Sequence, residues 1–285
     1  MLPIKRASAL AFFAPLTLPA TASTISLMRK FSILALLLLP CVVSAQSADA
    51  IVTRYLAARG GYDKIKAVSS ERVIGTISFG GGVDGLFLVE RERPLKMHME
   101  INLNGSTMIR VYDGKSAGWI YNPFAPNPSV QPMSEAELRN IFDEADFEGP
   151  FVDYKQKGNV IEFAGKADVQ GSPAYKLRLT NKNGDVSYFY FDGVTFLLLE
   201  WQGVRKVGDA EQTSESFFKD FREVEGLKYP FLIESRSPGT NQSQKLVASK
   251  IEVNMPIDAA HFAKPTPPPS PAAPPPAAPA DPAKP

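Results

Sequence analysis

The feature that most constrains this fold is a predicted hairpin between Val186 and Gln202. Asp192-Gly193 separates two runs rich in aromatic and branched residues. Because both residues tolerate positive φ, they predict a tight turn between two antiparallel strands. Phe189 and Phe191 face one side of the first strand while tyrosines face the other, so both faces are apolar. We therefore expect a packed core or helix against one face and a cavity or second layer against the other.

The first 45 residues have the pattern of an export signal. Met28-Arg29-Lys30 is basic, Phe31 to Leu39 is apolar, and Val43-Ser44-Ala45 is a small-residue cleavage site before Gln46. The weaker apolar patch at 9–18 is explained if translation starts at Met28, so residues 1–45 are expected to be an N-terminal extension and signal peptide. The apolar run is too short to span a bilayer comfortably. The expected location is the periplasm.

Cys41 is the only cysteine, which excludes a disulfide within the chain. Lipid attachment at Cys41 is an alternative to cleavage after Ala45, but Pro40 stands where a lipoprotein signal has a small residue, so cleavage is favoured. Four of the 31 basic residues precede Ala45, which leaves 27 against 30 acidic residues and a net charge of −3. Nucleic acid is not an expected partner, because its binding needs a basic surface.

Residues 46–264 are expected to form one α+β domain of short antiparallel strands and a few helices. Helices are predicted at 48–59 and 62–68, and a third follows a capping box at Ser134–Glu137. Besides the hairpin, strands are predicted at 71–79, 85–91, 95–103, 106–112, 118–121, 159–164, 174–180, 213–222, 227–236 and 245–253. The proline-rich segment 122–132 is expected to be a loop. Residues 265–285, dominated by Pro and Ala, are expected to form an extended, disordered tail.

The strand predicted at 95–103 alternates cleanly between apolar and polar residues. Its odd-numbered residues are Leu, Met or Ile, whereas Lys96, His98, Glu100 and Asn102 face the other way. This pattern predicts one interior face and one solvent face, with His98 on the solvent face.

Three motifs around this strand occur in a specific order. They are Arg93-Pro94-Leu95, Tyr112-Asp113-Gly114-Lys115 and Trp119-Ile120-Tyr121-Asn122-Pro123-Phe124. Their order and spacing resemble the periplasmic lipoprotein carriers of the LolA type. The resemblance is concentrated in residues 93–124, and the rest of the chain matches the wider LolA-like superfamily in layout.

The resemblance implies an open antiparallel half-barrel of about 11 strands, covered by a few helices and enclosing an apolar cavity for lipoprotein acyl chains. The arginine before the proline, which in the family helps to keep the empty cavity closed and is linked to passing cargo onward, matches Arg93. The expected lipid-binding residues are Arg93, Leu95, Met97, Met99, Ile101, Met108, Trp119, Phe124, Phe189, Phe191 and Leu198. For the methionines, ordinary core packing is the alternative, and for Arg93 an edge-strand charge.

Enzymatic motifs are absent from the sequence. His98 and His261 are the only histidines, they are far apart in the chain, and neither G-x-S-x-G nor H-E-x-x-H is present. Gly80–Gly82 lacks the Lys-Ser/Thr of a phosphate-binding loop, so a flexible turn explains it. We expect no enzyme, no catalytic residue, no cofactor and no metal, and we interpret both histidines as surface or capping residues rather than ligands.

The leading interpretation is an exported, monomeric carrier or chaperone that binds lipid acyl chains for outer-membrane lipoprotein sorting. Such a carrier implies a membrane-protein donor and an outer-membrane acceptor as partners. A sensor or scaffold module of the same fold is the first alternative, with the proline tail as a spacer or docking segment. A hydrolase of envelope lipids is the second.

Overall fold

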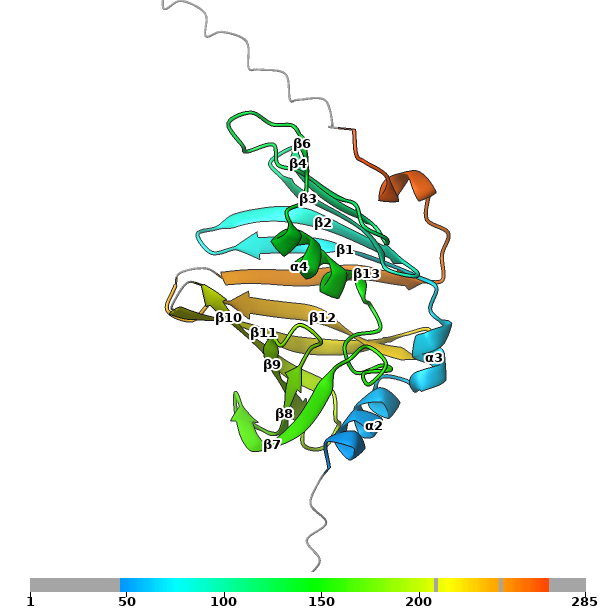
Figure 1. The fold of residues 1–285 in the computed structure, drawn as a ribbon, viewed down its shortest axis with the longest axis vertical. Coiled ribbons are helices and arrows are strands. Elements are labelled where there is room, and N and C mark those ends of the chain that lie inside the picture. The colour runs from blue at the N-terminus through cyan, green and yellow to red at the C-terminus, as the bar shows by residue number, and fades with distance from the viewer. Residues whose placement is uncertain (1–46, 208–209, 241–242, 267–285) are drawn as a thin grey trace, which may run out of the picture. The chain divides into compact units, whose positions relative to one another are not determined.

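The computed structural model describes residues 47–207, 210–240 and 243–266. The expected signal peptide, Cys41 and most of the proline tail lie outside these residues. Within them, thirteen strands form one antiparallel sheet (Figure 1) in the order β6-β5-β4-β3-β2-β1-β13-β12-β11-β10-β9-β8-β7. The strands are β1 (Ser70–Phe79), β2 (Val83–Glu92), β3 (Lys96–Leu103), β4 (Ser106–Asp113), β5 (Gly118–Tyr121), β6 (Val130–Pro132), β7 (Val160–Val169), β8 (Ser172–Thr180), β9 (Val186–Asp192), β10 (Leu198–Val207), β11 (Ala210–Val224), β12 (Leu227–Arg236) and β13 (Ser243–Val253).

Two meanders, β1–β6 and β7–β13, make up the sheet. They join in its middle, where β1 pairs antiparallel with β13 and Glu71 lies opposite Val253. The outermost strands β6 and β7 do not pair with each other, so the sheet is open. The expected α+β half-barrel is therefore confirmed, with thirteen strands instead of about 11. One of them, β6, lies in the segment predicted to be a loop.

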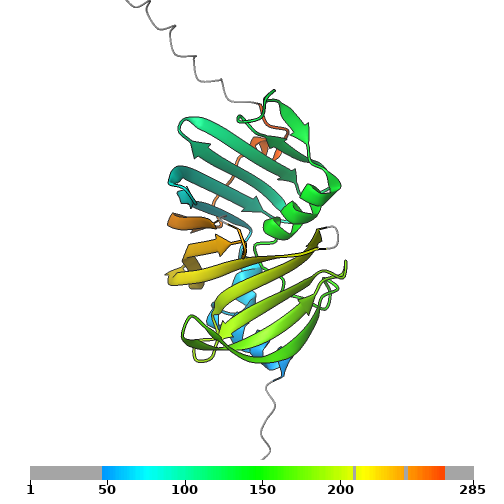
Figure 2. The ribbon, with the colours of Figure 1, turned by 90° about the vertical axis from the view of Figure 1, so that its left-hand side faces the viewer.

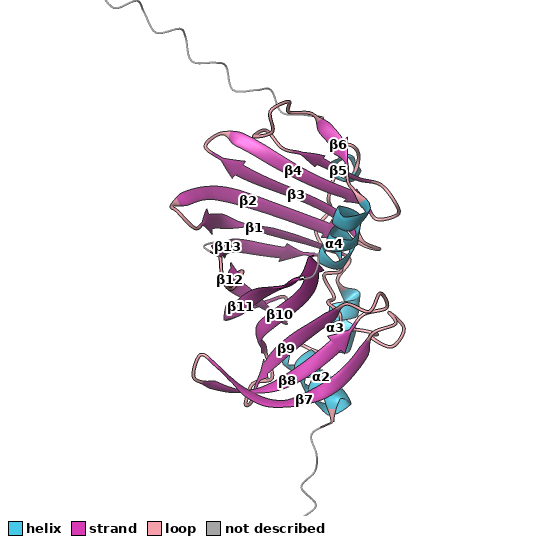
Figure 3. Cartoon of the chain, turned by 60° about the vertical axis from the view of Figure 1, so that its left-hand side comes forward, coloured by secondary structure: helices cyan, strands magenta, loops and turns pink. Residues whose placement is uncertain are grey.

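Three α-helices of the described chain lie on the same side of the sheet: α2 (Ala48–Ala58), α3 (Tyr62–Ala67) and α4 (Glu135–Ala145) (Figure 3). We call this side the inner face and the opposite side the outer face. The predicted capping box is present at α4, since the Ser134 hydroxyl accepts from the Glu137 amide and the Glu137 carboxylate accepts from the Ser134 amide. These two backbone amides at the start of the helix have no carbonyl partner within it, and the capping box supplies their hydrogen bonds.

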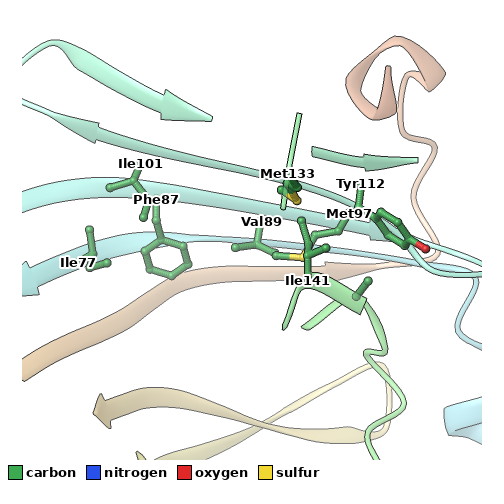
Figure 4. Close-up of a cluster of buried hydrophobic side chains, with 9 residues drawn as sticks. Ile77, Phe87, Val89, Met97, Ile101, Tyr112, Met133 and Ile141 are labelled. Atoms are coloured by element: carbon green, nitrogen blue, oxygen red, sulfur yellow. The ribbon is translucent and has the colours of Figure 1, made fainter. Parts of the chain in front are cut away.

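The inner face carries three apolar clusters, one beneath each covering element. The cluster beneath α4 combines residues of β1–β4 with the helix itself (Figure 4): Ile77, Phe87, Val89, Met97, Ile101, Tyr112, Met133, Ile141 and Ala145. A second lies beneath α2 and includes Phe189, Phe191 and Leu177. The third lies beneath α3 and includes Leu227, Phe231 and Ile251. Figure 2 shows the strands of the sheet side by side along its length. The inner face is apolar along most of this sheet.

The hairpin that organises the sequence pairs β9 with β10, but its turn is longer than predicted. The Asp192 carboxylate accepts hydrogen bonds from the amides of Val194 and Thr195, and β10 begins only at Leu198. Phe196, rather than the glycine, has a positive φ of 60°. Phe191 packs under α2, as expected for one face of the hairpin. On the outer face, Tyr190 packs against Phe217 of the same sheet, and no second layer of the described chain covers it there.

Candidate functional site

Helix α4 covers the inner face over β3 and β4. Its apolar side turns Ile141 and Ala145, both fully buried, toward the sheet beside Met97 and Tyr112 (Figure 4). The Arg110 guanidinium of β4 donates to both carboxylate oxygens of Glu144, at 2.9 and 3.3 Å, and ties the exposed side of the helix to the same strand. The helix is therefore held by one apolar contact and one bidentate ion pair.

The segment that follows α4, residues 147–154, covers a further part of the inner face together with α2 and α3. Phe151 is 2% exposed and packs edge-on against Phe189 and Phe191, with ring centroids 4.7 and 5.3 Å away. Val152, fully buried, belongs to the cluster beneath α3. We call residues 147–154 the plug, because a loop here places aromatic side chains against the apolar face of the sheet.

Arg93 connects the β2–β3 turn to α3 and the plug. Its Nε donates to the carbonyl of Val68 at 2.6 Å, and an Nη donates to the carbonyl of Lys66 at 3.0 Å. Its other Nη lies 2.5 Å from the carboxylate of Glu148, and the guanidinium stacks on the Phe147 ring at 5.2 Å. A cation at the C-terminal carbonyls of a helix interacts favourably with the helix dipole. Arg93 therefore fastens three separate segments at one point.

Glu148 is the anion of this junction. Besides Arg93, it lies 3.1 Å from the ammonium of Lys66 and 3.7 Å from that of Lys157, and its side chain is 8% exposed. Burial raises the pKa of Glu148, but the bonds to Arg93 and Lys66 outweigh burial and hold the pKa below its ordinary value of 4.5. The Arg59 guanidinium, at the end of α2, donates to the Glu148 backbone carbonyl at 2.9 Å. We call Arg93, Glu148, Lys66 and Lys157 the latch.

Most of the residues predicted to bind lipid lie on the inner face. Leu95, Met97, Met99, Ile101 and Met108 belong to the cluster beneath α4, and Phe189, Phe191 and Leu198 to the cluster beneath α2. Arg93 lies at the rim of this face in the latch. Trp119 instead lies on the outer face, with Val111 and Tyr121, and Phe124 is 57% exposed in the loop after β5.

Sequence reasoning missed the plug and Glu148. The only signal was a pair of apolar runs in a turn-rich segment, Phe147-Glu148-Gly149-Pro150-Phe151-Val152, which has neither helical nor strand periodicity. Aromatic residues on both sides of a Gly-Pro pair in a loop are unexpected at a surface, so this pattern could have indicated a covering segment.

The prediction that His98 faces solvent is wrong. The chain continues after β13 and places the 3-10 helix η2 (Ala259–Phe262) against β3 and β4. His98 is 6% exposed, and its ring lies 5.2 Å from the ring of His261, although the two residues are far apart in the chain. Glu90 of β2, fully buried, lies between them. Burial lowers the pKa of His98, but Glu100 and Glu90 outweigh burial and raise it above its ordinary value.

A pocket of about 290 Å³ opens at the other end of the sheet, away from the latch. Its lining is mixed: Phe79 and Phe217 contribute rings, and Gln170, Glu234 and Lys245 contribute polar groups. No helix in the described residues is long and apolar enough to cross a bilayer.

Comparison with known proteins gives matches in structure only. No family model and no curated protein matches the sequence. A LolA superfamily protein from Nitrosomonas europaea aligns with a TM-score of 0.54 at 13% identity, over 77% of this chain and 99% of the other. A putative outer membrane lipoprotein-sorting protein domain from Vibrio parahaemolyticus gives 0.52 at 12% identity, over 77% and 97%.

A third solved structure, a DUF1329 family protein from Desulfovibrio piger, gives a TM-score of 0.51 at 14% identity over 76% of this chain and 97% of the other. Each match spans nearly the whole of the other protein and 76–77% of this chain. At these identities the similarity is one of fold, and it agrees with the motifs around Arg93. The chain has the LolA-like fold.

Proposed function

We propose that this protein is an exported, non-enzymatic carrier that binds the acyl chains of lipoproteins or other lipids on the inner face of its sheet. The observation that carries the proposal is the nature of the inner face: apolar side chains extend along it beneath α2, α3, α4 and the plug. The likeness in fold to proteins described as LolA superfamily and lipoprotein-sorting supports it.

Acyl chains suit such a surface because their binding depends on the apolar area that is buried and not on a specific set of hydrogen bonds. Burial of apolar surface contributes roughly 25 cal/mol per Å², so a chain that replaces the plug against Phe189 and Phe191 regains the contacts that the plug gives up. Met97, Met99 and Met108 adapt to chains of different shape because their side chains are flexible and polarisable. Specificity for one lipid should accordingly be weak.

The latch gives the carrier a closed, empty state. The plug and α4 occupy the apolar face when no lipid is bound, and Arg93 and Glu148 hold the plug in place. Lipid entry requires these segments to move, so the free energy of the latch opposes binding and favours release. A cation with three carbonyl contacts and one buried carboxylate is suited to this role, because each of its bonds is charge-assisted.

The test is lipid binding by the full chain and by Arg93→Leu, measured by native mass spectrometry with lipid extraction on protein purified from its own envelope. Loss of hydrogen bonds to a charged group costs about 1.5–3 kcal/mol. If the substitution destabilises the closed, lipid-free state by this amount and leaves the lipid-bound state unchanged, the variant should bind lipid about 10–100-fold more tightly. Release to acceptor vesicles should slow in proportion.

Arg178→Leu is the matched control. Arg178 pairs with Glu162 across β7 and β8 at 2.7 Å and contacts neither α4 nor the plug, so its loss should leave lipid binding unchanged. If neither the full chain nor Arg93→Leu carries or binds lipid at equal folded fraction, the carrier function is wrong. Capture of one discrete polypeptide by lipid-free protein would instead favour a sensor or scaffold.

A further inference from the structure

Glu90, His98 and His261 bring three metal-binding side chains together on the outer face. Their ligand atoms, one carboxylate oxygen and one ring nitrogen from each histidine, all lie within 4.8 Å of one another. The carboxylate Oε2 of Glu90 is 3.3 Å from Nδ1 of His98 and 2.6 Å from Nδ1 of His261. Both Nδ1 atoms therefore point at the same oxygen.

The fold assembles this triad from three segments. Glu90 and His98 are paired opposite each other in the β2–β3 ladder, so their side chains emerge together on the outer face. His261 arrives from η2, which packs Phe262 beside Lys96. Glu90 and His98 are buried, while the His261 side chain remains 42% exposed. Two of the three side chains are therefore buried on strands of the sheet, and the third is half-exposed on η2.

The two distances from Glu90 to the histidines can be compared with the spacing of ligand atoms around a metal ion. Zinc binds histidine nitrogen at about 2.0–2.1 Å and carboxylate oxygen at about 2.0–2.2 Å in a tetrahedron, which sets neighbouring ligand atoms about 3.3–3.4 Å apart. The Glu90–His98 distance of 3.3 Å already has this value. The Glu90–His261 contact must open by about 0.7 Å to reach it, and the His261 side chain is 42% exposed, so it is not enclosed by packed protein on every side.

The surrounding groups orient the ligands. The other ring nitrogen of His98, Nε2, lies 3.3 Å from the Glu100 carboxylate, the carboxylate–histidine pairing that commonly fixes a metal-binding imidazole. Arg72 binds only the second Glu90 oxygen, Oε1, with its Nε at 2.7 Å and an Nη at 2.6 Å. Oε2 is thereby left for the triad, and the rotamer of Glu90 is fixed.

We propose that Glu90, His98 and His261 form a binding site for a divalent transition metal ion of the zinc class, which fastens the C-terminal segment to the sheet. Two imidazoles and one carboxylate are ligands typical of zinc with one remaining position for water. The positive charge of Arg72 weakens the site for a cation, whereas Glu100 adds negative charge on the other side. The site lies on the outer face and does not depend on the carrier function.

The experiment is titration of the full chain, without an affinity tag and with Cys41→Ser, with Zn²⁺ by calorimetry and with Co²⁺ by visible absorption. The chain has only two histidines and one cysteine, so this background leaves His98 and His261 as its only imidazole ligands and no thiol. We expect one ion per chain and the intense Co²⁺ bands of a tetrahedral site. Zn²⁺ should also raise the thermal midpoint, because an ion that binds only the folded state stabilises it.

Three variants separate a metal site from a hydrogen-bonded cluster. His261→Ala, at a half-exposed position, should fold and lose at least about 100-fold in Zn²⁺ affinity, together with the rise in thermal midpoint. Glu100→Ala, which removes an orienting group and no ligand, should lose about 10–100-fold. Glu162→Gln, a control carboxylate on β7 that pairs with Arg178 of β8 at 2.7 Å, should bind as the parent does. Absence of one-to-one binding in the parent, or binding that His261→Ala leaves unchanged, would overturn the proposal.

Discussion

At the scale of single residues, Glu148 is the carboxylate on which the cations of the latch converge. Its carboxylate neutralises Arg93 of the β2–β3 turn and Lys66 of α3, two cations that come from different parts of the chain. Burial favours the neutral form of a carboxyl group, whereas the neighbouring cations favour its ionised form. The ion pairs of Glu148 stabilise the fold only while its carboxylate is ionised. The strength of the latch therefore depends on pH through this one group.

The Glu148→Gln substitution should lower the free energy of unfolding at neutral pH by about 1.5–3 kcal/mol, the usual worth of hydrogen bonds to a charged group. Since the folded pKa of Glu148 lies below its ordinary value of 4.5, the stabilisation is complete above that value and disappears as the pH falls through the folded pKa. Urea unfolding of the wild type and the variant between pH 7 and pH 3 measures this. The two stabilities should converge as the pH falls through the folded pKa of Glu148.

Glu162→Gln is the matched control for that series, because Glu162 forms a half-exposed pair with Arg178 on the β7–β8 strands. It should follow the wild-type pH profile throughout. A constant stability difference between wild type and Glu148→Gln across the range would show that the ion pairs of Glu148 do not carry the latch.

At the scale of elements, α4 depends on its cap and on its contact with the sheet. It is eleven residues long, and an isolated helix of this length is marginal in water, so its capping box and its contact with the sheet must hold it together. The cap is formed by Ser134 and Glu137, and the contact with the sheet by Leu138, Ile141 and Ala145. Weakening the cap should therefore loosen α4 without disturbing the strands beneath it.

Ser134→Ala should cost about 1 kcal/mol, the typical worth of an N-cap side chain. We expect faster hydrogen exchange at the amides of α4 and unchanged exchange in β3 and β4. If opening of α4 admits lipid, acyl-chain affinity should rise about fivefold. Ser129→Ala is the control, since Ser129 bonds only the Gln131 side chain in the preceding loop. Uniformly faster exchange across the sheet would contradict a separately opening helix.

At the scale of the whole molecule, local patterns predicted most of the strands and the three covering helices, but neither the plug nor the position of η2. The alternation of Leu95, Met97, Met99 and Ile101 placed one face of β3 correctly, because a period of two depends only on neighbouring residues. The burial of His98 depends on His261, and the two meet at Glu90, which is 171 positions before His261. No periodicity links such distant segments.

The same limit applies to the inner face, where the plug reaches the sheet from a loop. Phe151 covers Phe189 and Phe191 without any secondary structure of its own, so hydrophobic patterning had nothing to detect. The prediction of a two-residue turn after Asp192 was wrong for a local reason. The Asp192 carboxylate accepts hydrogen bonds from the amides of Val194 and Thr195, and these bonds extend the loop beyond two residues. Side-chain hydrogen bonds of this kind compete with the tight turn that Asp-Gly usually indicates.

An apolar surface that extends along most of the sheet should bind longer acyl chains more tightly. Each buried methylene contributes about 0.8 kcal/mol, so affinity should rise about fourfold per carbon until the chain exceeds the inner face. Exchange of the head group at fixed chain length should change affinity far less. Displacement of a fluorescent fatty acid by a homologous series of lipids measures both dependences.

Two Asn substitutions on opposite faces locate the surface responsible. Met99 belongs to the cluster beneath α4, so Met99→Asn places an amide against the chain and should flatten the dependence on length. Ile74, 37% exposed on the outer face of β1, is the matched position, and Ile74→Asn should leave that dependence intact. If both variants bind every chain length as the wild type does, or if head groups dominate affinity, the inner face is not where lipid binds, and the latch would then close over a surface with another ligand.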